Sequence, residues 1–322
     1  MATPLRLQRF AFFALLILAA TLLLAACGDD DDDNGGGGDG NLSGTLDIDG
    51  SSTVYPISEG VAEEFSREHR DVRITVGFSG TGGGFEKFCN GEIQIADASR
   101  PVKQEELDAC AEAGIEMTEF EVAIDGLSVV VNPNNDWVTC LTVDQLTQMF
   151  GPNSTVETWA DVNPEWPDER ITFYMPGIDS GTFEYFTETI GGEAGATRTT
   201  NIQTSEDDNV LVTGIQGDEN AIGYFGYAYY VENQDRVKIV AIDNGSGCVE
   251  PNDETVNSGE YAPLSRPLYI YVNNEALREP HVAEFVRFYM TDGRAIIPEI
   301  GYVELPDEVY EENLEKIEEL AS

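Results

Sequence analysis

Four clusters of Ser, Thr and Gly each follow an apolar-alternating run and open a segment with helical periodicity. They occupy residues 50–53, 79–84, 99–101 and 179–182. Hydroxyl groups at a helix start stand beside unpaired backbone N–H donors at the positive end of the helix dipole. Such an arrangement can hold a small oxyanion without lysine or histidine. One such cluster is an ordinary helix cap, but four in one chain favour an anion site.

The elements that must position these clusters alternate between strand and helix. Alternating apolar residues predict strands at 72–76 and 93–96, and helices that begin near Pro56 and at Pro101. The second helix would carry Leu107 and Cys110 on its apolar side. Strands that alternate with helices predict parallel βα units, whose ligand sites lie beyond the carboxyl ends of the strands. All four clusters fall at such ends.

Two continuous apolar runs, 125–133 and 266–272, predict buried strands that cross between two domains. Residues 134–260 form a second α/β unit with a helix at 143–150 and an aromatic run at 223–230. We expect that run to pack inside its domain and not to stack on bases, because it contains no basic residue. Helices within 275–290 and 305–320 should complete the first domain.

The N-terminal residues 1–27 resemble a bacterial lipoprotein signal. Arg6 and Arg9 precede an apolar stretch, and the segment ends in Leu-Ala-Ala-Cys. We expect Cys27 to become the lipidated first residue, and an ordinary signal peptide with an incidental cysteine is the alternative. Residues 28–43 are rich in Asp and Gly and predict a disordered tether. The remaining chain would lie outside the cell membrane, in the periplasm or on the outer face, held by its lipid.

Four cysteines follow the signal: Cys89, Cys110, Cys140 and Cys248. An even number in an exported chain indicates two disulfides, for which three pairings exist. The local pairing of Cys89 with Cys110 is favoured because it would clamp two consecutive helices, and Cys140 would then pair with Cys248. A zinc site is disfavoured because the chain has no Cys-x-x-Cys motif. No metal and no cofactor are expected.

The net charge is extreme, at −43, with 60 acidic residues against 17 basic ones. Repulsion by this charge argues against nucleic acid as a partner. An acid-rich, lysine-poor composition resembles that of proteins from high-salt environments, where salt screens self-repulsion. A disordered acidic chain is disfavoured because 41% of the residues are hydrophobic and fall in periodic runs.

The Ser, Thr and Gly clusters and the residues around them together resemble the phosphate-binding receptors of Pst-type ABC importers, the PstS family. The resemblance runs from residue 45 to about 305, over the stretches 49–56, 79–85, 95–101, 177–183 and 299–302. It implies the α/β class II periplasmic-binding-protein fold. In this fold two lobes, each a mixed, mostly parallel sheet flanked by helices, are joined by two crossing segments. Residues 44–126 and 267–322 would form lobe I, and residues 127–266 would form lobe II.

The resemblance also implies one phosphate buried between the lobes. Many family members carry an arginine shortly before the Ser-Gly-Thr triplet, where this chain has 174–176 as Tyr-Met-Pro. Arg100 is therefore expected to be the only guanidinium near the anion. The ligands carried over by matching motifs are Ser52, Thr53, Ser79, Thr81, Gly82, Ser99, Arg100, Ser180, Gly181 and Thr182.

A carboxylate beside the anion would distinguish phosphate from sulfate. Hydrogen phosphate has a proton to donate, which sulfate lacks at neutral pH, so a carboxylate acceptor rewards phosphate and repels sulfate. Asp179 is the predicted acceptor and Asp97 the second candidate. The alternative role for Asp179 is to cap the helix that follows it.

The implied function is that of a monomeric, lipid-anchored receptor. It would deliver inorganic phosphate to the membrane permease subunits of an importer powered by a cytoplasmic ATPase. A hydrolase with Ser180 as nucleophile is disfavoured, because Ser180 lacks the Gly-x-Ser-x-Gly context. Two alternatives stay open: a receptor of the same fold for sulfate, molybdate or an organic phosphate, and a phosphate-responsive sensor or an adhesin.

Overall fold

The computed structural model describes residues 42–321, and the described residues belong to one compact unit. Cys27 and most of the predicted tether lie outside the described residues. The tether prediction extends two residues too far, because Leu42 packs against the core and the first strand begins at Ser43. Within the described part of the chain, no helix combines the length and apolarity needed to cross a membrane.

Three consecutive βα units open the fold. The strand β1 lies between β2 and β3 and runs parallel to both, so the carboxyl ends of the three strands share one edge of the sheet. The units are β1 (Ser43–Gly50) with α1 (Tyr55–Glu68), β2 (Asp71–Val76) with α2 (Thr81–Cys89), and β3 (Ile95–Ala98) with α3 (Gln104–Glu112).

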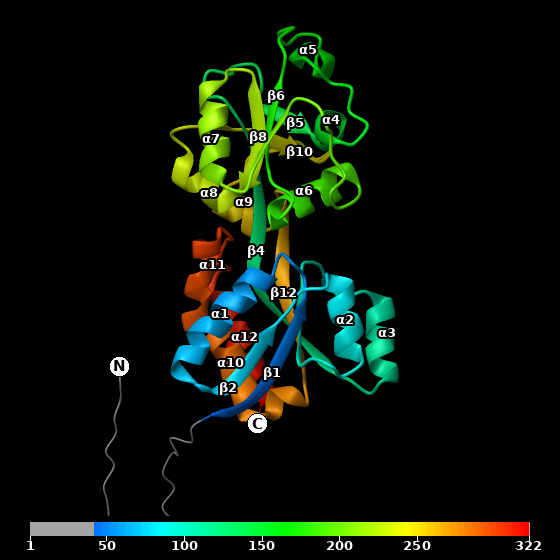
Figure 1. Cartoon of the computed structure of the whole chain (residues 1–322), viewed down its shortest axis with the longest axis vertical. Coiled ribbons are helices and arrows are strands. Elements are labelled where there is room, and N and C mark those ends of the chain that lie inside the picture. The colour runs from blue at the N-terminus through cyan, green and yellow to red at the C-terminus, as the bar shows by residue number, and fades with distance from the viewer. Residues whose placement is uncertain (1–41, 322) are drawn as a thin grey trace, which may run out of the picture. The chain divides into compact units, whose positions relative to one another are not determined.

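Two long strands, β4 (Met117–Val131) and β12 (Ser265–Asn273), run between two bodies of the structure (Figure 1). β4 pairs antiparallel with β12 up to Gly126 and with β8 (Ala221–Gly226) from Leu127 onward. We call the body that carries β1, β2 and β3 lobe I, and the body that carries β8 lobe II. The pairings among the βα strands are parallel and those of β4 and β12 are antiparallel, which makes the sheet mixed, as predicted.

Lobe II repeats the βα arrangement. β6 (Thr172–Pro176) lies between β8 and β7 (Ile202–Ser205) and is parallel to both. β9 (Lys238–Ile239) pairs with β4, and a small separate sheet contains β5 (Cys140–Thr142), β10 (Ala241–Asp243) and β11 (Cys248–Val249). The helices are α4 (Val143–Phe150), α5 (Trp159–Val162), α6 (Gly181–Gly191), α7 (Asp208–Gly217), α8 (Tyr227–Asn233) and α9 (Asp253–Asn257).

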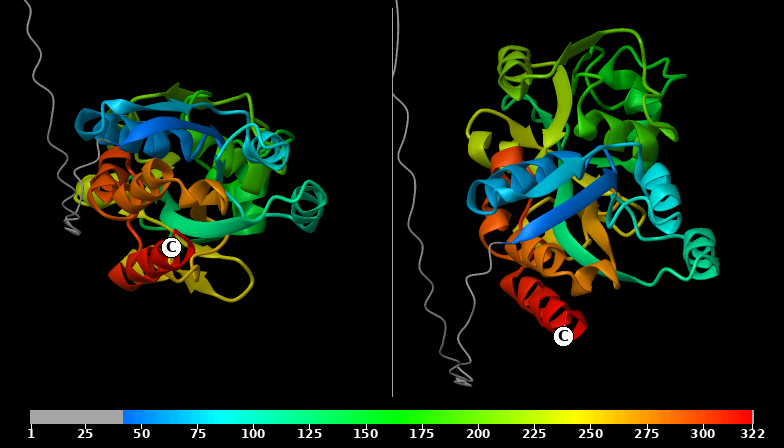
Figure 2. Two further views of the ribbon diagram at one scale, coloured as in Figure 1. Left: turned by 90° about the horizontal axis from the view of Figure 1, so that it is seen from below. Right: turned by 60° about the horizontal axis from the view of Figure 1, so that its bottom comes forward.

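The C-terminal segment returns to lobe I. The Tyr310 hydroxyl donates to the Val122 carbonyl of β4 at 3.0 Å, which fixes the last helix beneath the sheet. Figure 2 shows this helix at the outer side of lobe I. The elements are η1 (Ala276–Arg278), α10 (Pro280–Met290), η2 (Asp292–Ala295), α11 (Ile296–Ile300) and α12 (Asp307–Leu320).

Aromatic side chains fill the core of each lobe. In lobe I, Phe65 on the buried face of α1 meets Phe285 edge to face at 5.4 Å. In lobe II, Phe186 stacks on Tyr224 with ring centroids 3.7 Å apart. The aromatic run at 223–230 therefore packs within its domain, as expected, although it is divided between β8 and α8.

Both predicted disulfides are confirmed. Cys89–Cys110 joins α2 to α3, and Cys140–Cys248 joins β5 to β11.

The helix predicted from Pro101 begins three residues later, at Gln104. The reason is its cap: a Glu106 carboxylate oxygen accepts the Lys103 amide at 2.8 Å and sets the first turn there. Leu107 is correspondingly exposed, while Cys110 is the buried residue of α3.

Candidate anion site

The start of α2 forms one wall of the candidate site. Gly80 has φ +79°, a left-handed conformation that favours glycine, and its carbonyl accepts the Gly84 amide at 2.9 Å. The amides of Thr81 and Gly82 therefore precede the first helical hydrogen bond and have no acceptor inside α2. A Cβ on Gly84 would lie 2.5 Å from the Gly50 Cα, so only glycine lets α2 approach the end of β1.

The second and third clusters are hydrogen-bonded to each other. The Thr81 hydroxyl oxygen accepts the Ser99 amide at 3.3 Å and lies 3.3 Å from the Ser99 hydroxyl. Ser79 acts differently, because its hydroxyl donates to Asp49 at 2.5 Å. Asp49 also pairs with Lys87 at 2.6 Å. Ser79 thus braces the loop before α2, and its predicted role as a ligand has no geometric support.

The first cluster lies at the end of β1. The Ser51 amide donates to the Asp97 carbonyl at 2.9 Å, which ties this loop to β3. Ser52 donates from its hydroxyl to Glu184 of α6 at 2.5 Å, across the gap between the lobes. Thr53 is only 2% exposed, and its carbonyl accepts the Tyr302 hydroxyl at 2.9 Å.

The three lobe I clusters meet in a cavity of about 210 Å³ that we call the arginine cavity. Four of its ten lining residues are charged, two arginines and two glutamates. The glutamates come from α6 of lobe II, so the cavity lies between the lobes. Its lining residues are Ser51, Ser52, Gly80, Thr81, Gly82, Ser99, Arg100, Glu184, Glu188 and Arg266.

Arg100 and Arg266 give the arginine cavity its positive charge. Glu106 accepts two hydrogen bonds from Arg100, at 2.7 and 2.9 Å, and this contact raises the pKa of the guanidinium. Arg266, on β12, was not predicted, so the expectation that Arg100 is the only guanidinium near the site is wrong. The available signal was an arginine at the start of the apolar crossing run at 266–272.

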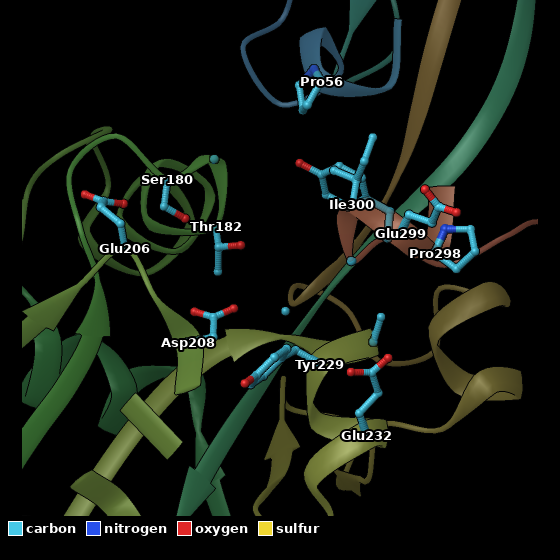
Figure 3. Close-up of a pocket in the computed structure, with 15 residues that line it drawn as sticks. Pro56, Ser180, Thr182, Glu206, Asp208, Tyr229, Glu232, Pro298, Glu299 and Ile300 are labelled. Atoms are coloured by element: carbon cyan, nitrogen blue, oxygen red, sulfur yellow. The ribbon is translucent and has the colours of Figure 1, made fainter. Parts of the chain in front are cut away.

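The fourth cluster lies elsewhere. Ser180, Gly181 and Thr182 line a neighbouring cavity of about 440 Å³, which we call the acidic cavity (Figure 3). Its lining residues are Pro56, Ser180, Gly181, Thr182, Glu206, Asp208, Gly226, Ala228, Tyr229, Glu232, Pro298, Glu299, Ile300, Gly301 and Tyr302.

Every charged side chain that lines the acidic cavity is a carboxylate. Figure 3 shows Glu206 and Asp208 beside Ser180 and Thr182, with Glu299 across the cavity. Burial and, secondarily, the nearby acidic side chains raise the pKa of Asp208 to about 6. An anion would be repelled here, so the smaller arginine cavity is the candidate anion site.

The two lobes touch where these cavities adjoin. A Cβ on Gly181 would lie 3.5 Å from both the Thr53 Cα and the Tyr302 hydroxyl oxygen, so the α6 start rests on the end of β1. The predicted ligand set is therefore divided. Ser52, Thr81, Gly82, Ser99 and Arg100 line the arginine cavity, Thr53 is buried beside it, and Ser180–Thr182 line the acidic cavity.

Neither predicted carboxylate lines the arginine cavity. Asp179 is exposed, and its amide donates to Glu206 at 3.3 Å on the acidic side. Asp97 is fully buried, accepts the Ser58 hydroxyl at 2.9 Å, and burial raises its pKa well above the ordinary value. Asp97 is therefore enclosed in the core of lobe I, away from an anion in the cavity. The carboxylate that lines the arginine cavity beside the Ser52 hydroxyl is that of Glu184.

Across residues 42–321, no group of three His, Cys, Asp or Glu side chains is placed to hold a metal ion. The chemistry that the arginine cavity offers is anion binding, through two guanidinium groups, hydroxyls and the amides at the α2 start.

Known proteins are similar to this chain in sequence, and solved structures are similar to it in fold. Protein SphX of Synechocystis sp. is 48% identical over 278 residues, 85% of this chain and 82% of its own. Phosphate-binding protein PstS of Staphylococcus saprophyticus is 40% identical over 283 residues, 87% of this chain and 86% of its own.

A crystal structure of a possible phosphate binding protein from Planctomyces limnophilus is 44% identical, with a TM-score of 0.84, and covers 87% of this chain and 100% of its own. A phosphate transport receptor from Vibrio cholerae, at 22% identity and TM-score 0.64 over 82% of this chain and 100% of its own, shares the fold. Residues 36–293 also match the family described as PBP superfamily domain. The chain therefore belongs to the PBP superfamily and, within it, to the family of the PstS and SphX proteins.

Proposed function

We propose that this protein is a receptor that binds inorganic phosphate between its lobes and delivers it to an ABC importer. The arginine cavity carries this proposal, because it is the place where Arg100, Arg266 and the α2 start converge. Charge-assisted hydrogen bonds from guanidinium groups are the strongest contacts a protein offers to an oxyanion. The PstS relative is named for phosphate binding, which supports the same ligand.

Selectivity for phosphate is assigned to Glu184 in place of Asp179. Its carboxylate accepts the Ser52 hydroxyl at 2.5 Å and lines the arginine cavity. An ionised carboxylate accepts a hydrogen bond from the O–H group of hydrogen phosphate and has no favourable contact with sulfate. The second carboxylate of the cavity, Glu188, is 62% exposed and makes no such hydrogen bond among the described residues.

Closure of the lobes would complete the site. A Cβ on Gly181 would lie 3.5 Å from the Thr53 Cα, and the α6 start with Ser180 and Thr182 lines the neighbouring cavity. The amides at the α6 start would then add donors from lobe II, as its helix dipole favours. The predicted ligands Ser180, Gly181 and Thr182 belong to that closed state in this proposal.

The remaining parts of the proposal rest on the sequence. Cys27 is the lipid attachment point, and the receptor works as a monomer outside the cell membrane. Its partners are the permease subunits of an importer driven by a cytoplasmic ATPase, and it performs no chemical step itself. The residue pair Gly126 and Leu127, where β4 changes its partner strand, is a natural place for the proposed lobe boundary.

Calorimetric titration of the folded protein with phosphate, sulfate and molybdate tests the proposal. We expect one phosphate per chain and no heat from sulfate or molybdate at concentrations that saturate phosphate binding. Equal or tighter binding of sulfate or molybdate would assign the cavity to another oxyanion. Absence of binding by all three would refute an oxyanion receptor.

A further inference from the structure

Arg266 is the charged residue of the arginine cavity that lies on a strand joining the lobes. It lies on β12, one of the two strands that join the lobes, directly opposite Asp125 of β4 in the antiparallel register. Its side chain is 15% exposed and that of Asp125 is 2% exposed, so both charges are largely removed from water. A buried charge destabilises the fold unless it is paired, so the partners of each guanidinium nitrogen matter.

Three hydrogen bonds and one aromatic contact hold the Arg266 guanidinium in place. Nε and Nη2 donate to Asp125 Oδ2 at 3.2 and 3.1 Å, and Nη2 also donates to the Thr53 hydroxyl oxygen at 3.1 Å. The guanidinium carbon lies 3.7 Å from the centre of the Tyr185 ring, which adds a cation–π contact from α6. Arg266 thus touches the joining strands, lobe I through Thr53 and lobe II through Tyr185.

The remaining nitrogen, Nη1, makes no hydrogen bond to the described residues, and Arg266 lines the arginine cavity. Nη1 lies 4.0 Å from a carboxylate oxygen of Glu188, which is beyond hydrogen-bond distance. Glu188 is largely exposed, so its carboxylate can leave when a stronger anion arrives. Nη1 carries two N–H groups, and a guanidinium stays protonated at any physiological pH. These two donors are therefore available to an oxyanion in the cavity.

We infer that Arg266 is a direct ligand of the bound anion, through Nη1, and that it fastens this anion to both lobes at their joint. The inference rests on the proposed phosphate site and adds a ligand that the motif resemblance does not contain. Arg100 holds the anion from lobe I, whereas Arg266 holds it from the strand pair about which the lobes would move. Asp125 is the positioning residue, because its carboxylate accepts the hydrogen bonds from Nε and Nη2 and leaves Nη1 for the anion.

The test is calorimetry with inorganic phosphate on a set of variants of the full folded chain. Arg266→Gln alone would leave Asp125 buried without a partner, so the informative variant is Arg266→Gln with Asp125→Asn, which removes both charges. We expect this double variant to bind phosphate about 10- to 100-fold more weakly. Asp125→Asn alone keeps the guanidinium and should lose no more than about 5-fold. Arg266→Lys keeps the positive charge but loses the planar guanidinium, so its phosphate affinity should lie between those of Asp125→Asn and the double variant.

Arg294→Gln is the matched control. Arg294 also pairs with carboxylates, Glu304 at 3.0 Å and Asp307 at 2.8 Å, and lies over an aromatic ring, Tyr310, but it does not line the arginine cavity. We expect this variant to bind phosphate as the parent protein does.

The outcomes separate this inference from the proposed function. If the parent protein binds phosphate and the folded double variant binds it within about 2-fold, Arg266 is no ligand and the inference is overturned. If Asp125→Asn loses as much affinity as the double variant while Arg266→Lys binds phosphate as tightly as the parent protein, the guanidinium makes no contact of its own with the anion, which also overturns the inference. If the parent protein fails to bind phosphate, the proposed function itself falls.

Discussion

Two side chains of opposite charge, Glu184 and Arg100, set the chemistry of the arginine cavity at the scale of single residues. Each is anchored by a specific hydrogen bond, Glu184 by the Ser52 hydroxyl and Arg100 by Glu106. Anchored side chains lose little further conformational freedom when a ligand binds, so their contacts count almost fully toward affinity.

Glu184→Gln tests which group reads the phosphate proton. The amide presents a donor where the carboxylate accepted, so phosphate binding should weaken by about 1 to 3 kcal/mol and the gap to sulfate should narrow. Titration of both anions measures the two effects. The control is Glu188→Gln, one helical turn away, which should leave the selectivity unchanged. If selectivity falls in the control and not in Glu184→Gln, the acceptor is Glu188.

Arg100→Ala tests the cation of lobe I. Loss of a charge-assisted hydrogen bond should cost about 1.5 to 3 kcal/mol of phosphate binding, while the fold stays intact because no core residue is removed. Arg67→Ala removes a comparable arginine that pairs with Glu63 and Glu64 on the surface of α1, and it should leave phosphate affinity unchanged. Equal affinities in the two variants would place Arg100 outside the site.

At the scale of elements, the start of α7 contains a destabilising charge. Asp208 is the first residue of α7, and burial raises its pKa to about 6 from an ordinary value of 3.8. The folded protein therefore binds this proton more tightly than the unfolded chain does. The free energy of unfolding should rise as the pH falls from about 6 toward 4, as far as this group is concerned.

Asp208→Asn should remove that pH dependence. At pH 8 the variant should be more stable than the parent by roughly 2 kcal/mol, because the cost of ionising a buried carboxyl beside Glu206 and Asp207 disappears. Urea unfolding at pH 4, 6 and 8 measures this. Asp235→Asn, which removes the same charge from an exposed loop, is the control and should show no such gain. A less stable Asp208→Asn protein at pH 8 would mean that the helix dipole outweighs burial at this position.

Local chemistry explains why the four strand-to-helix junctions could be predicted. Ser, Thr and Gly at a helix start act within a few residues of chain, so the sequence displays them directly. The helix at 143–150 and the strand at 266–272 also lie where their apolar patterns predict. The predicted start of α3, at Pro101, is wrong because the Glu106 side chain caps the helix at Lys103, three residues before it.

The composition of the cavity depends on contacts between distant segments, and these were not visible in the sequence. Glu184 meets Ser52 across 132 residues, and Arg266 meets Thr53 across 213. The packing of the lobes also decides which cavity the start of α6 lines. The sequence does not show this packing, and Asp179 lies on the side of the acidic cavity. The pairing of Arg266 with Asp125 follows from strand register, which a single apolar run does not reveal.

At the scale of the whole molecule, the net charge of −43 opposes the binding of an anion. Cleavage of the predicted signal would remove Arg6 and Arg9 and make the mature chain more acidic still. The long-range field therefore repels phosphate, although the arginine cavity attracts it at short range.

Salt should consequently help this protein. The Debye length falls from about 10 Å at 0.1 M to about 3 Å at 1 M, which screens the surface carboxylates from one another and from the incoming ligand. Between these concentrations the melting temperature and the phosphate association rate should rise, while the dissociation rate changes little. Stopped-flow binding and thermal melts measure these quantities. A melting temperature or an association rate that falls with salt would refute the interpretation of the acidic surface as an adaptation to salt.

One strand, β4, continues through the joint between the lobes, while β12 begins at the joint. β4 is hydrogen-bonded to β12 on one side of the joint and to β8 and β9 beyond it, and the Leu127 amide donates to the Leu264 carbonyl at 2.8 Å. In deuterium-exchange experiments, amides of β4 should therefore be among the slowest to exchange in the protein. Phosphate should leave these amides unchanged and slow exchange at the start of α6. In the proposed closure, such a joint would bend by twisting the sheet, and the backbone of β4 would stay hydrogen-bonded throughout.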